Sequence, residues 1–259
     1  MIGWKLVKRA GSDSLAAVQF LTRIPTPSLS YDPNSLSRAV KFFPFVGMVI
    51  GCAAALLHQL LTPHLPRLVT ALLVVVFLVS ITGCLHEDGL ADTADGFGGG
   101  SSREHVLAIL KDSRIGSYGG VALTLSLLAR VLLLASLPLT QVPQYLIAAH
   151  VLCRWTTLPL SYYLASARSL QDQGGAGQGA RIAKLTTSGT LIFGSLFTVA
   201  ICAFALRSHV AAAIAATIAV TLLSGLYYQR RISGVTGDCF GATNQLTEIA
   251  VYLTGVWIA

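Results

Sequence analysis

The sequence predicts an all-α integral membrane protein, a polytopic bundle of about six or seven transmembrane helices preceded by an N-terminal interfacial helix. Composition is the first observation: 54% of the 259 residues are hydrophobic and 11% are charged, whereas soluble domains carry about 25% charged residues. The mean hydropathy is +0.68. The second observation is that apolar residues gather in stretches of about 20, the length of helix that crosses a bilayer core. The third is that the charges lie between those stretches.

The N-terminal segment has a short apolar run broken by Gln19 and Arg23, which favours an amphipathic interfacial helix over a cleaved signal peptide. Transmembrane spans are then expected at 44–61, 67–85, 118–138, 143–165, 189–206 and 209–226, with a weaker one at 244–259. Very short turns join these spans in pairs, and longer polar loops are expected at 86–117, 166–188 and 227–243. Residues 1–259 therefore form a single integral membrane domain.

Basic residues favour one membrane face. If the N-terminus is cytoplasmic, 14 of the 18 Lys and Arg residues share its side: Lys5, Lys8, Arg9, Arg23, Arg38, Lys41, Arg103, Lys111, Arg114, Arg168, Arg181, Lys184, Arg230 and Arg231. The turns on the other side hold only Arg67 and Arg207. The positive-inside rule therefore predicts a multi-pass protein of the cytoplasmic (inner) membrane with a cytoplasmic N-terminus. The net charge of +7 follows from this rule and predicts no nucleic-acid partner.

Acidic residues are concentrated in the run HEDGLADTADG, residues 86–96, which holds four of the eleven in the chain. Asp88, Asp92 and Asp95 are spaced i, i+4, i+7 and would share one face of a helix. Like charges at this spacing repel unless a cation neutralises them, and carboxylate oxygens suit Mg²⁺ or Mn²⁺. The run therefore predicts a metal site on the cytoplasmic face, and Gly89 and Gly96 suit close approach of a phosphate to the backbone.

Two further runs lie on the same predicted face, KDSRIGSYGG at 111–120 and GVTGDCFGATNQLTE at 234–248. In the first, Asp112 is a further candidate metal ligand, Arg114 offers paired donors to a phosphate, and Gly116 allows a phosphate-binding turn. In the second, Asp238 and Glu248 bracket the entry to the last expected span. Gly237, Asp238 and Glu248 would therefore form another wall of a composite site.

Three side chains within or beside the spans are also candidates. Arg130 and Arg154 lie inside expected spans, where a charge normally faces the bundle interior and pairs with an acid or a substrate phosphate. Arg154 is deeper in its span and is the stronger candidate for contacting substrate. His86 adjoins the acidic run, and it could be a ligand, an acid–base group or an orienting group.

These three runs, with FLTRIPTP at 20–27 and FFPFVGMVIG at 42–51, resemble the cobalamin synthase family, the adenosylcobinamide-GDP ribazoletransferases. These are membrane enzymes of late vitamin B12 assembly. The similarity extends in order from about residue 19 to 250, and its most specific part has the form H-x-D-G-L-A-D-x-x-D-G. The glycine-rich segment QGGAGQGA, at 173–180, fits the family's cytoplasmic loop.

The resemblance implies that a hydroxyl of α-ribazole, or of its 5′-phosphate, attacks the cobinamide-proximal phosphorus of adenosylcobinamide-GDP. Adenosylcobalamin or its phosphate forms, and GMP leaves. Mg²⁺ held by Asp88, Asp92 and Asp95 would offset the diphosphate charge. Asp95 or Asp238 would accept the hydroxyl proton, and Arg114 or Arg154 would steady the GMP. The sequence leaves the oligomeric state open, and membrane lipid is the one other partner expected.

Two alternatives compete with this interpretation. The acidic motif also resembles that of CDP-alcohol phosphotransferases of lipid synthesis, but those enzymes carry an Arg where this chain has Asp92. A divalent-cation transporter would place its acids along a path through the membrane, whereas here the acids gather on one face.

Overall fold

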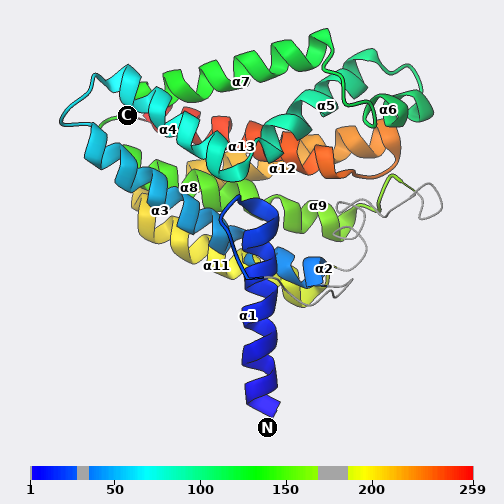
Figure 1. Cartoon of the computed structure of the whole chain (residues 1–259), viewed down its shortest axis with the longest axis horizontal. Coiled ribbons are helices and arrows are strands. Elements are labelled where there is room, and N and C mark those ends of the chain that lie inside the picture. Colours follow the sequence, from blue (N-terminus) through cyan, green and yellow to red (C-terminus); the bar gives the residue numbers. More distant parts are fainter. Residues whose placement is uncertain (1, 28–34, 169–185, 259) are drawn as a thin grey trace.

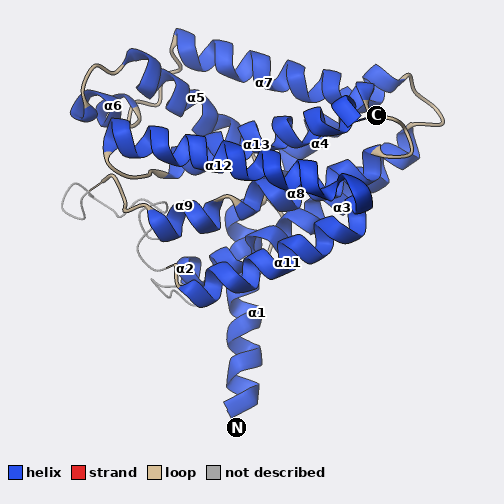
Figure 2. Cartoon of the chain, turned by 180° about the vertical axis from the view of Figure 1, so that it is seen from behind, coloured by secondary structure: helices blue, strands red, loops and turns tan. Residues whose placement is uncertain are grey.

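The computed structural model describes residues 2–27, 35–168 and 186–258. Within these ranges the chain consists of helices joined by loops and turns (Figure 2), and the one β-type contact is an isolated bridge between Ser166 and Val235. The elements are α1 (Ile2–Leu21), α2 (Ser35–Ala39), η1 (Val40–Phe42), α3 (Phe43–Leu61), α4 (Arg67–Thr82), α5 (Leu85–Gly99), α6 (Arg103–Ile109), α7 (Ser117–Ser136), α8 (Val142–Trp155), α9 (Thr157–Tyr163), α11 (Ser188–Leu206), η3 (Arg207–His209), α12 (Val210–Ile232) and α13 (Gly237–Ile258). The predicted all-α fold is confirmed. The glycine-rich segment 173–180, Arg181 and Lys184 lie outside the described residues.

The bundle has two distinct ends (Figure 1). The short turns at 62–66, 137–141 and 207–209 lie at one end, on the left of the view, together with the C-terminus. At the opposite end lie α5, α6 and the connection between α12 and α13. The turns that lack acidic residues are thus separated from the three candidate runs, as the sequence predicts. We call the end that holds α5, α6 and the α12–α13 connection the acidic end.

The N-terminal helix α1 runs across the bundle rather than along it (Figures 1 and 2). This direction is the one expected of a helix that lies in the membrane interface. Asp13 of α1 is buried and forms ion pairs with Arg38, at 3.1 Å, and Lys41, at 3.5 Å. These pairs attach the inner part of α1 to the segment that leads into α3.

Apolar helices make the chain a polytopic membrane protein. Among the residues that the structure describes, three helical stretches are long and apolar enough to cross a membrane: Ser35–Leu61, Ser117–Ser136, and Ser188–Ile232, which holds both α11 and α12. A fourth arises if α4 and α5, which meet at 88°, count as one broken span. The expected number of six or seven is therefore not confirmed.

Two expected spans differ from the observed helices, and in both cases neighbouring helices bury the residues concerned. The expected span 143–165 is divided at Thr156 into α8, of 14 residues, and α9, of 7 residues. The expected span 244–259 belongs to α13, which begins earlier and carries buried polar residues such as Gln245 and Glu248. Most residues of α8 and many of α13 are buried, so neighbouring helices cover them and an apolar surface is not required all round.

Two of the expected polar loops are wrong. Segment 86–117 contains α5 and α6, and most of segment 227–243 belongs to the ends of α12 and α13. Helix α4 ends where Gly83 and Cys84 adopt left-handed backbone conformations, with φ of 63° and 61°. The chain then turns by 88° into α5. Helix α5 is polar, so it lacks the long apolar stretch that indicates a helix elsewhere in the sequence.

Candidate active site

The predicted metal-binding run lies on α5 at the acidic end. Its helical structure is the one that the spacing of Asp88, Asp92 and Asp95 predicts. Asp88 is exposed, Asp92 is half-buried and Asp95 is buried. Burial thus increases along the series, and the three carboxylates differ in what they contact.

Asp95 holds the start of α7. The backbone amides of Gly116 and Gly119 donate hydrogen bonds to its two carboxylate oxygens, at 2.7 and 2.8 Å. A Cβ at either glycine would lie within 2.4 Å of one of these oxygens, so the approach requires glycine. The free amides and the dipole of a helix N-terminus stabilise a carboxylate there. Gly116, predicted to contact substrate, therefore binds Asp95 and joins the second run to the first.

The third run reaches α5 because α5 and α13 cross at two glycines. A Cβ at Gly89 would lie 2.8 Å from the backbone oxygen of Asp238, and a Cβ at Gly241 would lie 3.2 Å from the Cα of Gly89. The two backbones can approach this closely only because neither residue has a side chain. Gly89 thus allows helix α13 to approach α5 closely. Gly237 is the first residue of α13 and is exposed beside Asp238.

We expect Gly89→Ala to lower the thermal unfolding midpoint of the detergent-solubilised protein, because the new Cβ would push α5 from α13. Overpacking of this kind costs about 1–3 kcal/mol. Gly120→Ala is the matched control, since a Cβ there meets nothing within 4 Å. Equal midpoints for the two variants would contradict the tight crossing.

Asp92 lies among like charges. The negative charges of Asp88, Asp238 and Asp95 repel its carboxylate, and the positive charge of Arg168 offsets only part of this repulsion. A cavity of about 230 Å³ adjoins this group, and its lining includes Glu87, Asp88 and Asp92 together with apolar residues of α4 and α7. Within the described part of the chain, no hydrogen bond or ion pair engages the carboxylates of Asp88 and Asp92. Repulsion in this cluster would be relieved by a bound cation.

The acidic cluster fits Mg²⁺ in donor type, although it is not a complete protein cage. Among the residues that the structure describes, no three His, Cys, Asp or Glu side chains are placed to hold one metal ion together. Proteins usually bind Mg²⁺ through one or two carboxylates, with waters and substrate phosphates completing the coordination. Asp88 and Asp92 fit a shared site of this kind.

Asp238 and Asp112, the two other candidate acids, each have a basic partner. Arg168 lies 3.4 Å from Asp238 Oδ2, and the Thr236 hydroxyl donates to the same oxygen at 3.2 Å. Asp112 and Arg114 form an exposed pair, with Arg114 Nε 2.9 Å from Asp112 Oδ1. Hydrogen bonds from Arg114 lower the pKa of Asp112 to about 2. Asp112 is thus engaged with its neighbour rather than with the acids of α5.

A buried charged network lies beneath the acidic cluster and connects α5, α7 and α13. Arg130 Nη1 donates to Glu87 Oε1 at 2.7 Å, and Arg130 Nε donates to Glu248 Oε1 at 2.9 Å. The Gln245 amide donates to Glu87 Oε1 at 3.2 Å and its oxygen accepts from Arg130 at 3.2 Å. Arg130 and Glu248 are each 1% exposed, so the pairing of Arg130 with an acid is confirmed. Glu248, predicted to contact substrate, is placed inside this network.

His86 and Arg154 are also buried near this network. Arg154 Nη1 lies 2.9 Å from His150 Nδ1, and His150 Nε2 lies 3.8 Å from Glu248 Oε1. Arg154 is 2% exposed, and its guanidinium bonds to His150 and Cys153, so it faces the bundle interior as expected. Its contact with substrate stays a prediction. His86 is 6% exposed on the inner side of α5, away from open solvent.

Several residues that shape the site were not singled out by sequence reasoning: Glu87, Arg168, Gln245 and His150. Usable signals exist for two of them. Glu87 belongs to the acidic run at 86–96, and Gln245 stands three residues before Glu248 on α13. Arg168 carries no such signal, because its partner Asp238 is 70 residues away.

Together, the fold and the site define a helical membrane protein with a carboxylate-lined cavity at one end. Residues 13–256 match the family model of cobalamin-5-phosphate synthase. The chain belongs to this family.

Curated relatives cover nearly the whole chain. This chain is 42% identical to the adenosylcobinamide-GDP ribazoletransferase of Azorhizobium caulinodans, and the alignment covers 95% of this chain and 96% of that protein. The protein of the same name from Sinorhizobium medicae is 40% identical over 95% of this chain and 96% of its own length. The Vibrio cholerae protein of that name is 36% identical, with 92% and 91% covered. No solved structure matches the chain.

Proposed function

We propose that this chain is an adenosylcobinamide-GDP ribazoletransferase that acts in the final step of cobalamin synthesis. It transfers the phosphocobinamide group of adenosylcobinamide-GDP to a hydroxyl of α-ribazole, or of its 5′-phosphate. GMP is released, and adenosylcobalamin or its phosphate forms. The observation that carries the proposal is the match to the family over residues 13–256, in a chain whose three acidic runs meet at one end of the bundle.

In the proposed reaction, a new bond forms between the ribazole hydroxyl oxygen and the cobinamide-proximal phosphorus. The phosphorus–oxygen bond to GMP breaks, and GMP leaves with its electron pair. Asp88 and Asp92 would hold Mg²⁺, which when bound offsets the charge of the diphosphate. Arg114, an exposed residue between Ser113 and Ile115 of the cavity lining, would release Asp112 and bind the departing phosphate.

Asp238 is the candidate that we favour as proton acceptor. Its Oδ2 is bound by Thr236 and Arg168, which leaves Oδ1 for the attacking hydroxyl. Asp95 is less suited to this task because both of its oxygens accept hydrogen bonds from backbone amides. Its proposed role is instead to position α5 against α7.

The acidic end is proposed to face the cytoplasm. Arg103, Lys111, Arg114, Arg230 and Arg231 lie in the segments at this end, whereas the turns at the other end carry only Arg67 and Arg207. The positive-inside rule assigns the more basic segments to the cytoplasmic face of the inner membrane. Water-soluble substrates would then reach the cavity without crossing the bilayer.

The test is an assay of the purified protein with adenosylcobinamide-GDP and α-ribazole. We expect equal amounts of GMP and a cobalamin in the presence of Mg²⁺, and no product after chelation with EDTA, because the phosphoryl charge is then not offset. Restoring Mg²⁺ should restore activity. Absence of product under all conditions would refute the proposed reaction, and full activity in EDTA would refute the metal requirement alone.

A further inference from the structure

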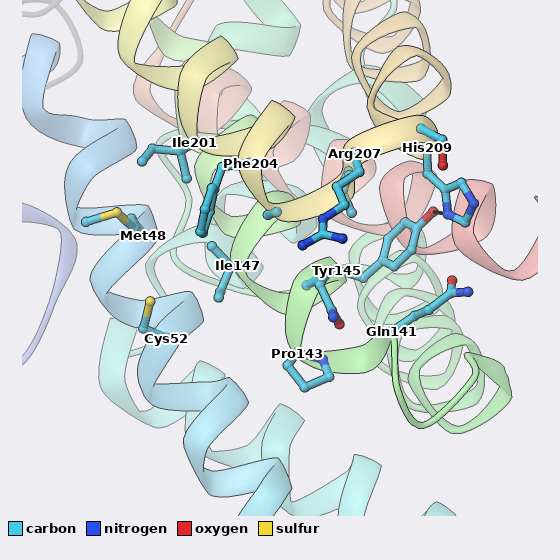
Figure 3. A pocket seen from close by; sticks show the side chains of 14 residues that line it. Met48, Cys52, Gln141, Pro143, Tyr145, Ile147, Ile201, Phe204, Arg207 and His209 are labelled. Atoms are coloured by element: carbon cyan, nitrogen blue, oxygen red, sulfur yellow. Dashed lines mark hydrogen bonds between the residues drawn. The ribbon is translucent and has the colours of Figure 1, made fainter.

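A second pocket lies beside the turns at 137–141 and 207–209, at the end of the bundle opposite the acidic residues (Figure 1). Figure 3 shows this pocket from close by. It is formed by α3, α8 and α11 together with the turn at 207–209. Its volume is about 680 Å³, and small-molecule sites commonly have volumes of about 300–1,000 Å³. None of the acidic residues discussed above lines it.

The lining changes from apolar to polar along the pocket. Met48, Ile147 and Phe204 line the apolar part, and Phe204 is 84% exposed. Gln141 and Arg207 line the polar part, where helices end in short turns. In a membrane protein, exposed apolar helix surface faces acyl chains, whereas helix ends face the headgroup region. The pocket therefore extends across the boundary between these two regions.

Arg207 supplies a positive charge at this boundary. Its side chain points into the pocket, between Phe204 and Tyr145 in the view of Figure 3. Residue 207 has a φ of 50°, an uncommon and costly conformation for a residue other than glycine, and ends α11. In the part of the chain that the structure describes, no hydrogen bond or ion pair engages its guanidinium. The turns at this end contain no Asp or Glu.

We propose that this pocket binds an anionic phospholipid. The Arg207 guanidinium would bind the lipid phosphate, for which its planar paired donors are well suited. One acyl chain would cover Phe204, Ile147 and Met48, which favours a lipid over a free phosphate because burying apolar surface stabilises the complex. The bound lipid would hold the α11–α12 turn in one leaflet, and the site is independent of the chemistry at the acidic end.

The test is a titration of the full-length protein, in a neutral detergent, with phosphatidylglycerol. Binding to the folded protein raises the thermal unfolding midpoint. We expect a larger rise with phosphatidylglycerol than with phosphatidylcholine of the same chains, and no rise with glycerol 3-phosphate. Arg207→Gln should raise the half-saturating phosphatidylglycerol concentration about five-fold, as expected for one basic residue at a membrane surface.

Arg67→Gln is the matched control at the same end of the bundle, since the Arg67 guanidinium already donates to the Leu137 carbonyl. It should leave the half-saturating concentration unchanged. Ala205→Trp should fill the pocket and remove the response while keeping Arg207. Native mass spectrometry of retained phosphatidylglycerol gives the same comparison without heating. Equal responses of wild type and Arg207→Gln, equal responses to the two lipids, or a response to glycerol 3-phosphate would each overturn the proposal.

Discussion

Replacing Asp92 with Asn is expected to lower kcat/KM by about 100-fold or more, because the charge that it supplies acts on the transition state. The same change is expected to leave the unfolding midpoint unchanged or higher. Asp92 is half-buried beside Asp88, Asp95 and Asp238, whose charges all oppose its own. Within the described residues no hydrogen bond or ion pair engages its carboxylate. Removing its charge therefore relieves repulsion, as is common where function opposes stability.

Three measurements separate this role from a structural one. The half-saturating Mg²⁺ concentration should rise in Asp92→Asn if the carboxylate is a metal ligand. Glu104→Gln is the matched control, because Glu104 is an acid at the same end whose side chain is 77% exposed. It should keep both activity and midpoint. Loss of activity in Asp92→Asn together with a lower midpoint would point to a packing role and contradict the assignment.

The composition of the acidic end could be predicted from sequence, but its internal contacts could not. The i, i+4, i+7 spacing of Asp88, Asp92 and Asp95 is a local property, and it correctly indicates a helix. The engagement of Asp95 by the Gly116 and Gly119 amides depends on how α5 packs against α7. No local pattern specifies that packing, so sequence reasoning could group the runs on one face without assigning their partners.

The same limit applies to the buried arginines. A charge within an apolar helix must be paired in the interior, and this argument correctly places Arg130. Its partners Glu87 and Glu248 are 43 and 118 residues away, so only the packed bundle reveals them. Depth within a span also favoured Arg154 for a substrate contact, whereas its guanidinium is buried and bonds to His150, one turn earlier on the same helix α8.

Arg130→Met is expected to lower stability by about 3–5 kcal/mol, the typical cost of removing one partner from a buried ion pair. Arg130 bridges Glu87 and Glu248, which lie on helices separated in the sequence and are buried with 4% and 1% exposure. The two carboxylates would remain in the interior without their shared cation. The midpoint of thermal unfolding and the yield of monodisperse protein in detergent both measure the loss. Arg114→Met, which removes a guanidinium from the surface, should leave both unchanged.

Compensating variants test whether the loss arises from charge rather than from packing. Adding Glu87→Gln and Glu248→Gln to Arg130→Met removes both unpaired carboxylates, and we expect the triple variant to recover much of the lost stability. Arg130→Lys should fall between wild type and Arg130→Met, because an ammonium keeps the charge but lacks the planar group that reaches both acids. A triple variant as unstable as Arg130→Met would contradict the electrostatic account. Recovery of folding without recovery of transferase activity would show that the network also fixes α5, and with it Asp88 and Asp92, against α13.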